Sequence, residues 1–413
     1  MKTLDSYAVA VRPHFPALKR TVNGQPVAYF DGPGGTQIPQ SVADAVTEYL
    51  LGHNANDGWA YPTSLETDEI LSRSRATVAA FLDATPDEVV FGANMTTLTF
   101  HLARALGRSL SRGDEVIVTD LDHHANVDPW VALARDYGAV VRRVPLRDGT
   151  PELDLDAYRA MLSQKTKIVA VGLSSNAFGT INPVAAMVAD AHRVGAVAYV
   201  DAVHAAAHGV LDVRALDADL LAFSAYKVYG PHVGIAFVRD ALLERLDVPK
   251  LAPQSSFGAK RAESGTMNFE GIAGTAAALD FIAALDADAT SPVRERLTRA
   301  MRGLAREEQT TFAALLAGLR ATDGVTLYEP PTGVPRHPTV AFTVDGIDSE
   351  TVSRTLGSHH GVFVSHGNFY ASTAVAQVAP HVADDGGVVR AGIAMYTTHD
   401  DVARLVAGVA ALV

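Results

Sequence analysis

One lysine lies inside an otherwise uncharged, apolar stretch of the chain. In 219-DLLAFSAYKVYGPHVGIAFVR-239, Lys227 is the only residue of formal charge between Asp219 and Arg239. The apolar run, interrupted by glycine and proline, predicts two buried strands. An amine at such a place either extends to solvent at a sheet edge or is kept for covalent or acid–base chemistry. This stretch alone leaves both interpretations open.

Polar side chains also follow three other strand-like runs. They are Asp201 in 197-VAYVDAVHAAAHG-209, Ser174, Ser175 and Asn176 in 172-GLSSNAFGTINP-183, and His123 and His124 in 117-IVTDLDHHANVDPW-130. Each has an ordinary explanation when taken alone, because a polar residue after a strand often caps a helix and a histidine pair is commonly structural or exposed. Their combination carries more information than any one of them.

A further stretch, 91-FGANMTTLTFHLARALG-107, leads from a strand end into a helix through Gly92, Asn94 and Thr96. Backbone N–H groups at a helix start, with hydroxyls beside them, form a cradle for phosphate. An N-cap that binds no ligand is the alternative explanation for this segment by itself.

Together these residues match the requirements of pyridoxal 5′-phosphate. The amine of Lys227 can bond to the cofactor, and Asp201 can keep the pyridine nitrogen protonated so that the ring accepts carbanion charge. His123 can pack on the ring face, and the helix start can take the phosphate. A metal site made of His123, His124, Asp201 and His204 is the rival hypothesis, although no HExxH or similar helical ligand spacing is present.

The elements that must position these residues alternate between strand and helix. Alternation of this kind predicts βαβ units and a mostly parallel sheet with helices on both faces, and such sheets bind ligands at the carboxyl ends of their strands. Near residue 284 a long amphipathic helical stretch begins, and a smaller α/β region follows it. We therefore expect an α/β fold with a major domain over 24–285 and a minor domain over 286–413, with residues 1–23 packed on the minor domain. The strands are expected at 115–120, 139–146, 167–173, 196–203, 220–225 and 233–238.

Composition narrows the possible partners and the possible chemistry. The 413 residues carry 34 basic and 46 acidic side chains, a formal charge of −12, which argues against nucleic acid or an anionic membrane as a partner. The absence of cysteine excludes disulfides, thiolate-ligated metals and a thiol nucleophile. Since the first twenty residues have no long apolar core and no run of about 18 apolar residues occurs, we expect a cytoplasmic protein.

The chain resembles a known family over essentially its whole length. The motifs that carry the resemblance are 122-DHHANVDPW-130, 175-SNAFGTINP-183, 200-VDAVHAAAH-208, 224-SAYKVYGPHVGIAFV-238 and 388-VVRAGIAMYTTHDDVARLV-406. They are similar to motifs of the class V aminotransferase family of fold-type I pyridoxal-phosphate enzymes, in its cysteine desulfurase-like branch. That resemblance implies a large domain built on a mostly parallel mixed sheet flanked by helices, together with a smaller C-terminal α/β domain.

The resemblance also implies a role for each matching residue. Lys227 would carry the cofactor, Asp201 would hold the pyridine nitrogen, and His123 would stack on the ring. Asn176 would lie near the phenolic oxygen of the cofactor. Arg390 would bind the substrate α-carboxylate, for which its planar fork is suited.

Further residues would complete the cofactor site. Met95, Thr96, Ser224 and Tyr226 fall at or beside phosphate-binding positions, and His204 falls where the desulfurase-like branch has a cofactor-contacting glutamine. The loop 263-ESGTMNF-269 is similar to one that completes a phosphate site across a homodimer interface, with Thr266 as the expected contact. We therefore expect a homodimer with active sites at the interface.

The chain departs from the desulfurase pattern where it matters most for chemistry. The loop that carries the nucleophilic cysteine in desulfurases corresponds to 365-SHGNFYAS-372, with Tyr370 at the cysteine position. Two other stretches, 31-DGPGGTQIP-39 and 52-GHNANDGWAYPTSLET-67, resemble a desulfurase-like subgroup of unassigned function. In the second stretch His53, Asn54 and Asn56 are candidate substrate contacts, and turn formation is the alternative role for the asparagines.

Without a thiol, these residues favour a lyase that acts on an amino acid with a leaving group on its β-carbon, such as a C–S bond. Lys227 can remove the α-proton, and the leaving group then departs without an enzyme nucleophile. An aminotransferase or an epimerase needs the same lysine and arginine and is the main alternative. A catalytically silent binding protein is a third possibility, which the presence of Lys227, Asp201 and Arg390 disfavours.

Overall fold

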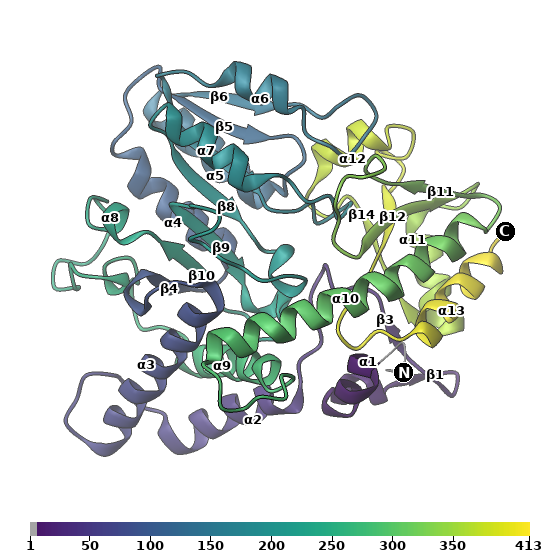
Figure 1. The fold of residues 1–413 in the computed structure, drawn as a ribbon, viewed down its shortest axis with the longest axis horizontal. Helices are drawn as coiled ribbons and strands as arrows, with labels where there is room; N and C mark the ends of the chain where they lie inside the picture. The colour runs from purple at the N-terminus through teal and green to yellow at the C-terminus, as the bar shows by residue number, and fades with distance from the viewer. Residues whose placement is uncertain (1–5) are drawn as a thin grey trace.

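The computed structural model describes residues 6–413, and a seven-stranded mixed sheet forms the centre of its larger part (Figure 1). Six of its strands point the same way, and β10 runs antiparallel to both of its neighbours, β4 and β9. In spatial order the strands are β4 (Val89–Gly92), β10 (Gly234–Val238), β9 (Leu220–Ser224), β8 (Val197–Asp201), β7 (Thr166–Gly172), β5 (Glu115–Thr119) and β6 (Val140–Val144). The six strands expected from sequence are confirmed, and the strand end expected before Asn94 belongs to β4, at one edge of the sheet.

Both faces of this sheet are buried because side chains alternate between the two faces along each strand. One face presents Phe91, Ile117, Val169, Val200, Phe223 and Phe237 to one apolar core. The other presents Val90, Val118, Ala170, Tyr199, Ala222 and Ala236 to a second core. Burial on both sides explains why these strands read as continuous apolar runs rather than as an alternating pattern.

Two sets of helices cover these faces. The first core is completed by α3 (Pro62–Leu82), α6 (Leu155–Met161), α7 (Val184–Arg193), α9 (Phe269–Ala283) and the first half of α10 (Val293–Arg320). The second is completed by α4 (Met95–Gly107), α5 (Asp128–Tyr137) and α8 (Asp240–Leu243). Helix α2 (Gln40–Glu48) packs on α9 rather than on the sheet.

A second, smaller unit follows along α10, which runs from the large sheet to the small one (Figure 1). Its antiparallel sheet has the order β11 (Val325–Tyr328), β12 (Thr339–Val344), β15 (Val388–Gly392) and β14 (Ser365–Gly367). Its other elements are α11 (Ser349–Thr355), β13 (Val362–Phe363), α12 (Ser372–Val378) and α13 (His399–Ala410). Apolar side chains of α10, α11 and α13 pack on β12 and β15 to form a third core.

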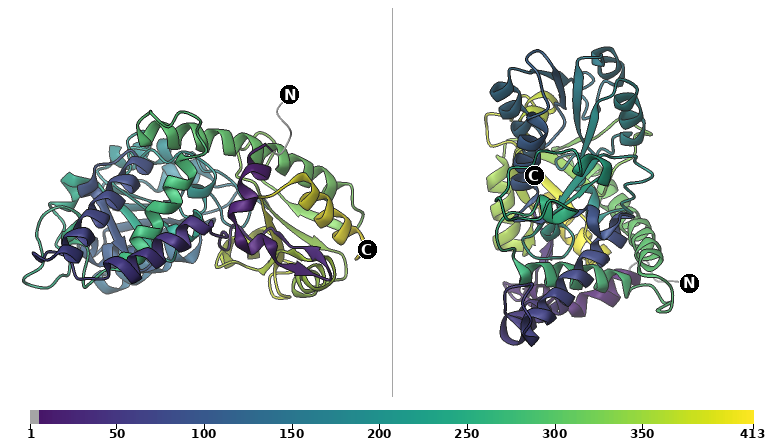
Figure 2. Two further views of the ribbon diagram at one scale, coloured as in Figure 1. Left: turned by 90° about the horizontal axis from the view of Figure 1, so that it is seen from below. Right: turned by 90° about the vertical axis from the view of Figure 1, so that its left-hand side faces the viewer.

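The N-terminal segment lies along this smaller unit (Figure 2). It comprises α1 (Ser6–Val11), β1 (Thr21–Val22), β2 (Gln25–Pro26) and β3 (Ala28–Tyr29). Strand β3 pairs in parallel with β13, and the carboxylate of Glu307 accepts hydrogen bonds from the backbone N–H groups of Tyr7 and Ala8 at 2.9 Å. The division of the chain at residues 24 and 285 stays a prediction. Over residues 6–413 no helix combines the length and the apolar character needed to cross a membrane.

Candidate active site

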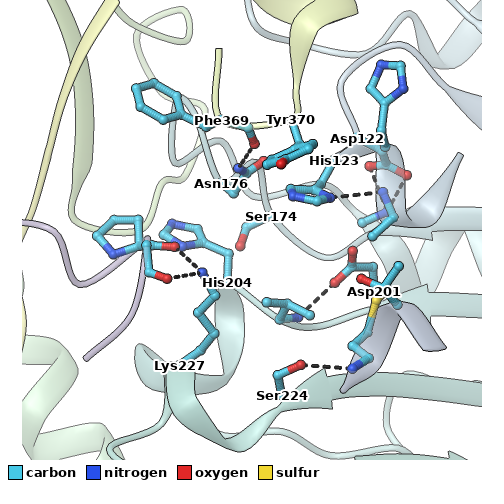
Figure 3. A pocket seen from close by; sticks show the side chains of 18 of the residues that line it. Asp122, His123, Ser174, Asn176, Asp201, His204, Ser224, Lys227, Phe369 and Tyr370 are labelled. Carbon is cyan, nitrogen blue, oxygen red and sulfur yellow. Dashed lines mark hydrogen bonds between the residues drawn. The ribbon is translucent and has the colours of Figure 1, made fainter. Parts of the chain in front are cut away.

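Five strand ends meet at one edge of the large sheet and surround a cavity of about 840 Å³. Figure 3 shows side chains that line this cavity. Strands β4, β5, β7, β8 and β9 all end at this edge because they are parallel to one another, so the residues that follow them gather there. The cavity is closed from the other side by β14 and the loop after it. The residues expected from sequence to line it, and found there, are Met95, Thr96, His123, Asn176, Asp201, His204, Ser224, Tyr226, Lys227, Tyr370 and Arg390.

Lys227 ends a short 3-10 turn, Ala225–Lys227, directly after β9. Its ammonium donates hydrogen bonds to the carbonyl oxygens of Pro33 at 2.6 Å and Gly34 at 2.7 Å, and it lies 5.0 Å from the centre of the Tyr226 ring. Burial, reinforced by the positive charge of Arg390, lowers the pKa of Lys227 to about 7. A substantial fraction of this amine is therefore neutral, and nucleophilic, near neutral pH.

Asp201 is the last residue of β8 and is buried at the base of the cavity. Its carboxylate accepts a hydrogen bond from the Val203 N–H at 2.8 Å, and burial raises its pKa to about 6. Asp122 lies on the same wall and accepts hydrogen bonds from the Gly172 N–H at 2.9 Å and the Asn126 side chain at 2.8 Å. Burial and the nearby Asp201 raise the pKa of Asp122 to about 7. The N–H donors do not neutralise these carboxylates, so their charged forms stay costly at neutral pH unless a cation faces them.

His123 stands in the wall of the cavity with a defined tautomer. Its Nδ1 accepts a hydrogen bond from the Ala125 N–H at 2.9 Å, so the proton of the neutral ring is on Nε2. Burial, followed by the positive charge of Lys227, lowers the pKa of His123 to about 4. A neutral, flat ring is the form best suited to packing on an electron-poor aromatic cofactor.

The start of α4 forms one end of the cavity. Asn94 caps the helix by accepting a hydrogen bond from the Thr97 N–H at 2.9 Å, and the Met95 N–H donates to the Ser224 hydroxyl at 2.9 Å. Thr96 follows Met95 in the first turn of α4 and is exposed at the positive end of the helix dipole. At Gly234 any side chain would strike the Asn94 backbone, since a Cβ there would lie 2.4 Å from the Asn94 carbonyl carbon. Glycine at the start of β10 therefore allows the helix start to approach the sheet.

Arg390, in the middle of β15, extends from the small unit into the opposite end of the cavity and is 3% exposed. Its guanidinium donates to the Ser365 hydroxyl at 3.1 Å, to the Asn176 carbonyl at 3.0 Å and to the Asp31 carboxylate at 3.3 Å. Burial lowers its pKa to about 10, which still leaves it charged at neutral pH. The side chain is thus a fixed, desolvated cation facing the ligand space.

The loop after β14 carries Phe369 and Tyr370 over the cavity. The Tyr370 ring centre lies 5.5 Å from that of His123 with the planes tilted by 32°, and the side chain is 75% exposed. The Tyr370 carbonyl accepts a hydrogen bond from the His124 N–H at 2.7 Å. The ring therefore covers His123 at the mouth of the cavity.

Two buried oxygens in the cavity wall have no hydrogen-bond partner within the described residues: Ser174 Oγ and Asn176 Oδ1 (Figure 3). The Asn176 amide nitrogen donates to the Phe369 carbonyl at 2.9 Å, which fixes the orientation of the amide. A buried polar atom without a partner costs about 1–3 kcal/mol. Both atoms therefore indicate a ligand with polar groups in this cavity.

His204 belongs to a buried cluster between the two units of the fold. Its Nε2 lies 3.2 Å from the Thr339 hydroxyl of β12, and its ring centre lies 5.2 Å from that of His208. His208 in turn contacts the buried Glu308 of α10 at 3.0 Å. Burial, with the neighbouring positive groups, lowers the pKa of His204 well below its ordinary value. The cluster keeps His204 neutral and holds its ring against the cavity.

Comparison with known proteins identifies the family. The Aminotransferase class-V family model matches residues 28–405. Cysteine desulfurases of Enterobacter sp. (strain 638) and Escherichia coli (strain K12 / DH10B) are 34% and 33% identical over 417 residues, covering 96% of each chain. The apo structure of a cysteine desulfurase from Thermococcus onnurineus NA1 superposes with a TM-score of 0.87 at 26% identity, covering 98% of each chain. The crystal structure of a cysteine desulfurase from Escherichia coli in its S-sulfonic acid form superposes with a TM-score of 0.82 at 25% identity, covering 97% of each chain.

The chain belongs to the class-V aminotransferase family. Its cysteine desulfurase-like character and its α/β fold, both expected from sequence, are confirmed. It is therefore a pyridoxal-phosphate-dependent enzyme.

The cavity of this class-V protein has the donor set that pyridoxal 5′-phosphate needs. The two oxygens without partners, Ser174 Oγ and Asn176 Oδ1, face space that an aromatic ring with polar substituents would fill. The buried carboxylate of Asp201 gains a cation if it faces the protonated pyridine nitrogen. The partly neutral amine of Lys227 and the α4 start lie around the same space. The residues present fit this cofactor, and the individual roles remain predictions.

Three residues of the expected site lie away from this cavity. Thr266 lines a separate groove with Asp57 and Ser255. His53 is paired with Glu66, its Nδ1 lying 2.7 Å from the carboxylate, and Asn54 follows it on an exposed loop. Within one chain, therefore, neither the Gly265–Thr266 loop nor the loop at residues 53–56 contacts the cofactor space.

Large apolar side chains near these two loops in the sequence are exposed. Leu51, Trp59 and Phe257 are 84%, 60% and 85% exposed, and an interface with a second copy of the chain would cover them. We expect sedimentation to show a dimer. We also expect Thr266→Ala to weaken cofactor retention, while Thr310→Ala on the exposed side of α10 leaves it unchanged. A monomer that retains the cofactor fully would contradict this arrangement.

Within residues 6–413 no group of three histidine, cysteine or acidic side chains is placed to hold a metal ion. No role is expected from sequence for two residues that line the cavity, Asp122 and Phe369, or for Asp31, which pairs with Arg390. Their signals were present but weak, because Asp122 directly precedes the histidine pair, and Asp31 and Phe369 lie in stretches singled out only for their resemblance.

Proposed function

We propose that this class-V family member is a lyase that eliminates a leaving group from the β-carbon of an amino acid. The observation that carries the proposal is the lack of any cysteine, together with Tyr370 in the loop that covers the cavity. Forming a persulfide requires a thiol on the enzyme, whereas elimination requires only a base and an anchored substrate. Desulfurases are relatives of this chain, but their route needs a residue that this chain does not contain.

Different side chains around the cavity would bind the substrate and transfer its proton in such a reaction. When bound, pyridoxal 5′-phosphate supplies the electron sink for the α-carbon of the substrate. Arg390 holds the α-carboxylate and thereby orients the α-proton. Lys227, whose amine is partly neutral near pH 7, takes that proton at Nζ and can return it to the leaving group.

Other residues tune and close the site. Asp201 places a carboxylate where a ring nitrogen needs a counter-charge, and His123 provides a neutral surface for stacking. The Tyr370 ring covers His123 and excludes water from the mouth of the cavity. We propose this covering role for Tyr370 rather than proton donation, because its side chain is largely exposed.

A screen of amino acids against the purified protein tests the proposal. With substrates that carry a good β-leaving group, such as cysteine S-conjugates, we expect release of pyruvate. With free L-cysteine we expect no enzyme-bound persulfide.

Tyr370→Phe should change the rate little if the ring only covers the site, whereas loss of a proton donor would lower it by about 100-fold or more.

Aminotransferase and epimerase activity remain the alternatives, since both use Lys227 and Arg390 in the same positions. If the screen gives only amino-group transfer, with the cofactor converted to its amine form and no pyruvate from β-substituted substrates, the lyase proposal is wrong. Inversion at the α-carbon without elimination would identify an epimerase instead. Chiral analysis of the recovered amino acid separates these outcomes.

A further inference from the structure

The guanidinium of Arg390 is covered by an aromatic ring that the proposed chemistry of the site does not require. Its central carbon lies 4.0 Å from the centre of the Phe369 ring, which is within the range of a strong cation–π contact. Because Arg390 is almost fully buried, this contact is desolvated, and such contacts are stronger inside proteins than at exposed sites. Phe369 therefore both shields the cation and fixes the plane of its fork.

The remaining contacts of Arg390 leave room for one ligand. A guanidinium has five N–H donors. Nε donates to Ser365, one terminal nitrogen donates to the Asn176 carbonyl, and the other donates to Asp31. By this count one N–H stays available on each terminal nitrogen, and a carboxylate that bridges the two nitrogens would take both. With Phe369 over one face, a carboxylate must approach in the plane of the fork.

The loop that carries Phe369 is held in a costly conformation. Phe369 and Tyr370 both have left-handed backbone angles, with φ of 56° and 55°, which non-glycine residues adopt at a cost. The large unit offsets this cost, because the Asn176 side chain donates to the Phe369 carbonyl and the His124 N–H donates to the Tyr370 carbonyl. The Tyr370 N–H donates to Asn368 Oδ1 within the loop. Contacts from both units therefore determine the position of the ring.

We propose that Phe369 is a specificity-determining residue that selects substrates by their α-carboxylate. It does so by keeping the Arg390 guanidinium dry and the orientation of its plane fixed, so that a planar anion entering at the edge of the fork binds best. Asn176 is a positioning residue in this arrangement because it holds the Phe369 carbonyl. The inference deepens the proposed function and rests on its assignment of Arg390 to the α-carboxylate.

Two small ligands that differ only in the carboxylate test this proposal. The cofactor-loaded protein is titrated with L-alanine and with ethylamine, and dissociation constants are taken from the change in visible absorbance. L-alanine carries no leaving group, so elimination cannot occur, and the fast absorbance change on mixing reports binding before any slower amino-group transfer. We expect Phe369→Ala to weaken L-alanine binding about tenfold, and ethylamine binding less than twofold. Phe369→Tyr, which keeps the ring, should retain the wild-type preference.

A second measurement, made on the cofactor-free protein, reports whether the Phe369 ring covers the Arg390 guanidinium. Phenylglyoxal modifies accessible guanidinium groups, and peptide mapping gives the modification rate of Arg390 itself. In the cofactor-free protein we expect Phe369→Ala to raise this rate several-fold over wild type and over Phe369→Tyr. Equal losses of L-alanine and ethylamine binding would overturn the proposal, as would unchanged or tighter L-alanine binding in Phe369→Ala. An unchanged modification rate at Arg390 would also overturn it.

Discussion

Replacing Lys227 by Ala is expected to abolish the covalent attachment of pyridoxal 5′-phosphate and to lower turnover by at least about 10²- to 10⁴-fold. That range is the contribution of one positioned acid–base group, and loss of the covalent bond adds to it. Borohydride reduction of the wild-type protein should fix the cofactor on the peptide that contains Lys227. Lys19→Ala, at an exposed lysine of the N-terminal segment, is the matched control and should behave as wild type.

The lowered pKa of Lys227 adds a pH dependence to this prediction. Only the neutral amine attacks the cofactor, and a pKa of about 7 means that this form becomes dominant above neutral pH. Capture of cofactor by the cofactor-free protein should therefore accelerate from pH 6 to pH 8 and then level off, as followed by stopped-flow absorbance. A free lysine, with an ordinary pKa near 10.4, would still be accelerating at pH 9. Label recovered on any other lysine would contradict the assignment of the whole site.

Asp201→Asn is expected to weaken cofactor retention by roughly 10- to 100-fold, the scale of one charged hydrogen bond. The amide oxygen of asparagine can still accept the Val203 N–H, so the substitution removes charge with little change of shape. Asp212→Asn is the control, because that carboxylate lies on another loop, 3.3 Å from Arg294, and does not line the cavity. Equal effects of the two substitutions on the measured Kd would mean that another group holds the ring.

The same substitution should stabilise the protein when the cofactor is absent. Burial raises the pKa of Asp201 to about 6 from an ordinary value of 3.8, so its contribution to stability is present below pH 3.8 and is lost as the pH rises through 6. At pH 8 the buried charge costs on the order of 3 kcal/mol. Cofactor-free Asp201→Asn should therefore have a higher Tm than wild type at pH 8, with the difference disappearing near pH 4. A lower Tm at pH 8 would show that another group neutralises this carboxylate.

These two opposite effects mean that the charge of Asp201 destabilises the cofactor-free protein and stabilises the protein with its cofactor bound. A carboxylate buried beside Asp122 is unfavourable in the free protein and favourable once a cation faces it. The partners of Lys227, two backbone carbonyls, likewise accept hydrogen bonds from the amine without neutralising its charge. Comparing the Tm values of wild type and Asp201→Asn, each with and without cofactor, measures how much of the cost of the buried charge the cofactor offsets.

By itself, the sequence determined the large sheet, the lack of a thiol and the convergence of the cofactor residues. Strands buried on both faces need long apolar runs, and in a parallel sheet the residues that follow those runs must meet at one edge. Lys227, Asp201, Asn176 and His123 could therefore be placed together from local pattern alone. The exclusion of a persulfide route follows directly from composition.

Only the tertiary structure decided which distant segments complete the site. The carbonyls of Pro33 and Gly34, 194 and 193 residues earlier in the chain, hold the Lys227 amine. Phe369 covers Arg390 from a loop that Asn176 and His124 of the large unit hold in place. Local pattern carries no signal for these contacts, because they depend on how α10 and the N-terminal segment orient the small sheet against the large one. For the same reason the fold, and not the motif, placed His53 and Thr266 outside the cavity of their own chain.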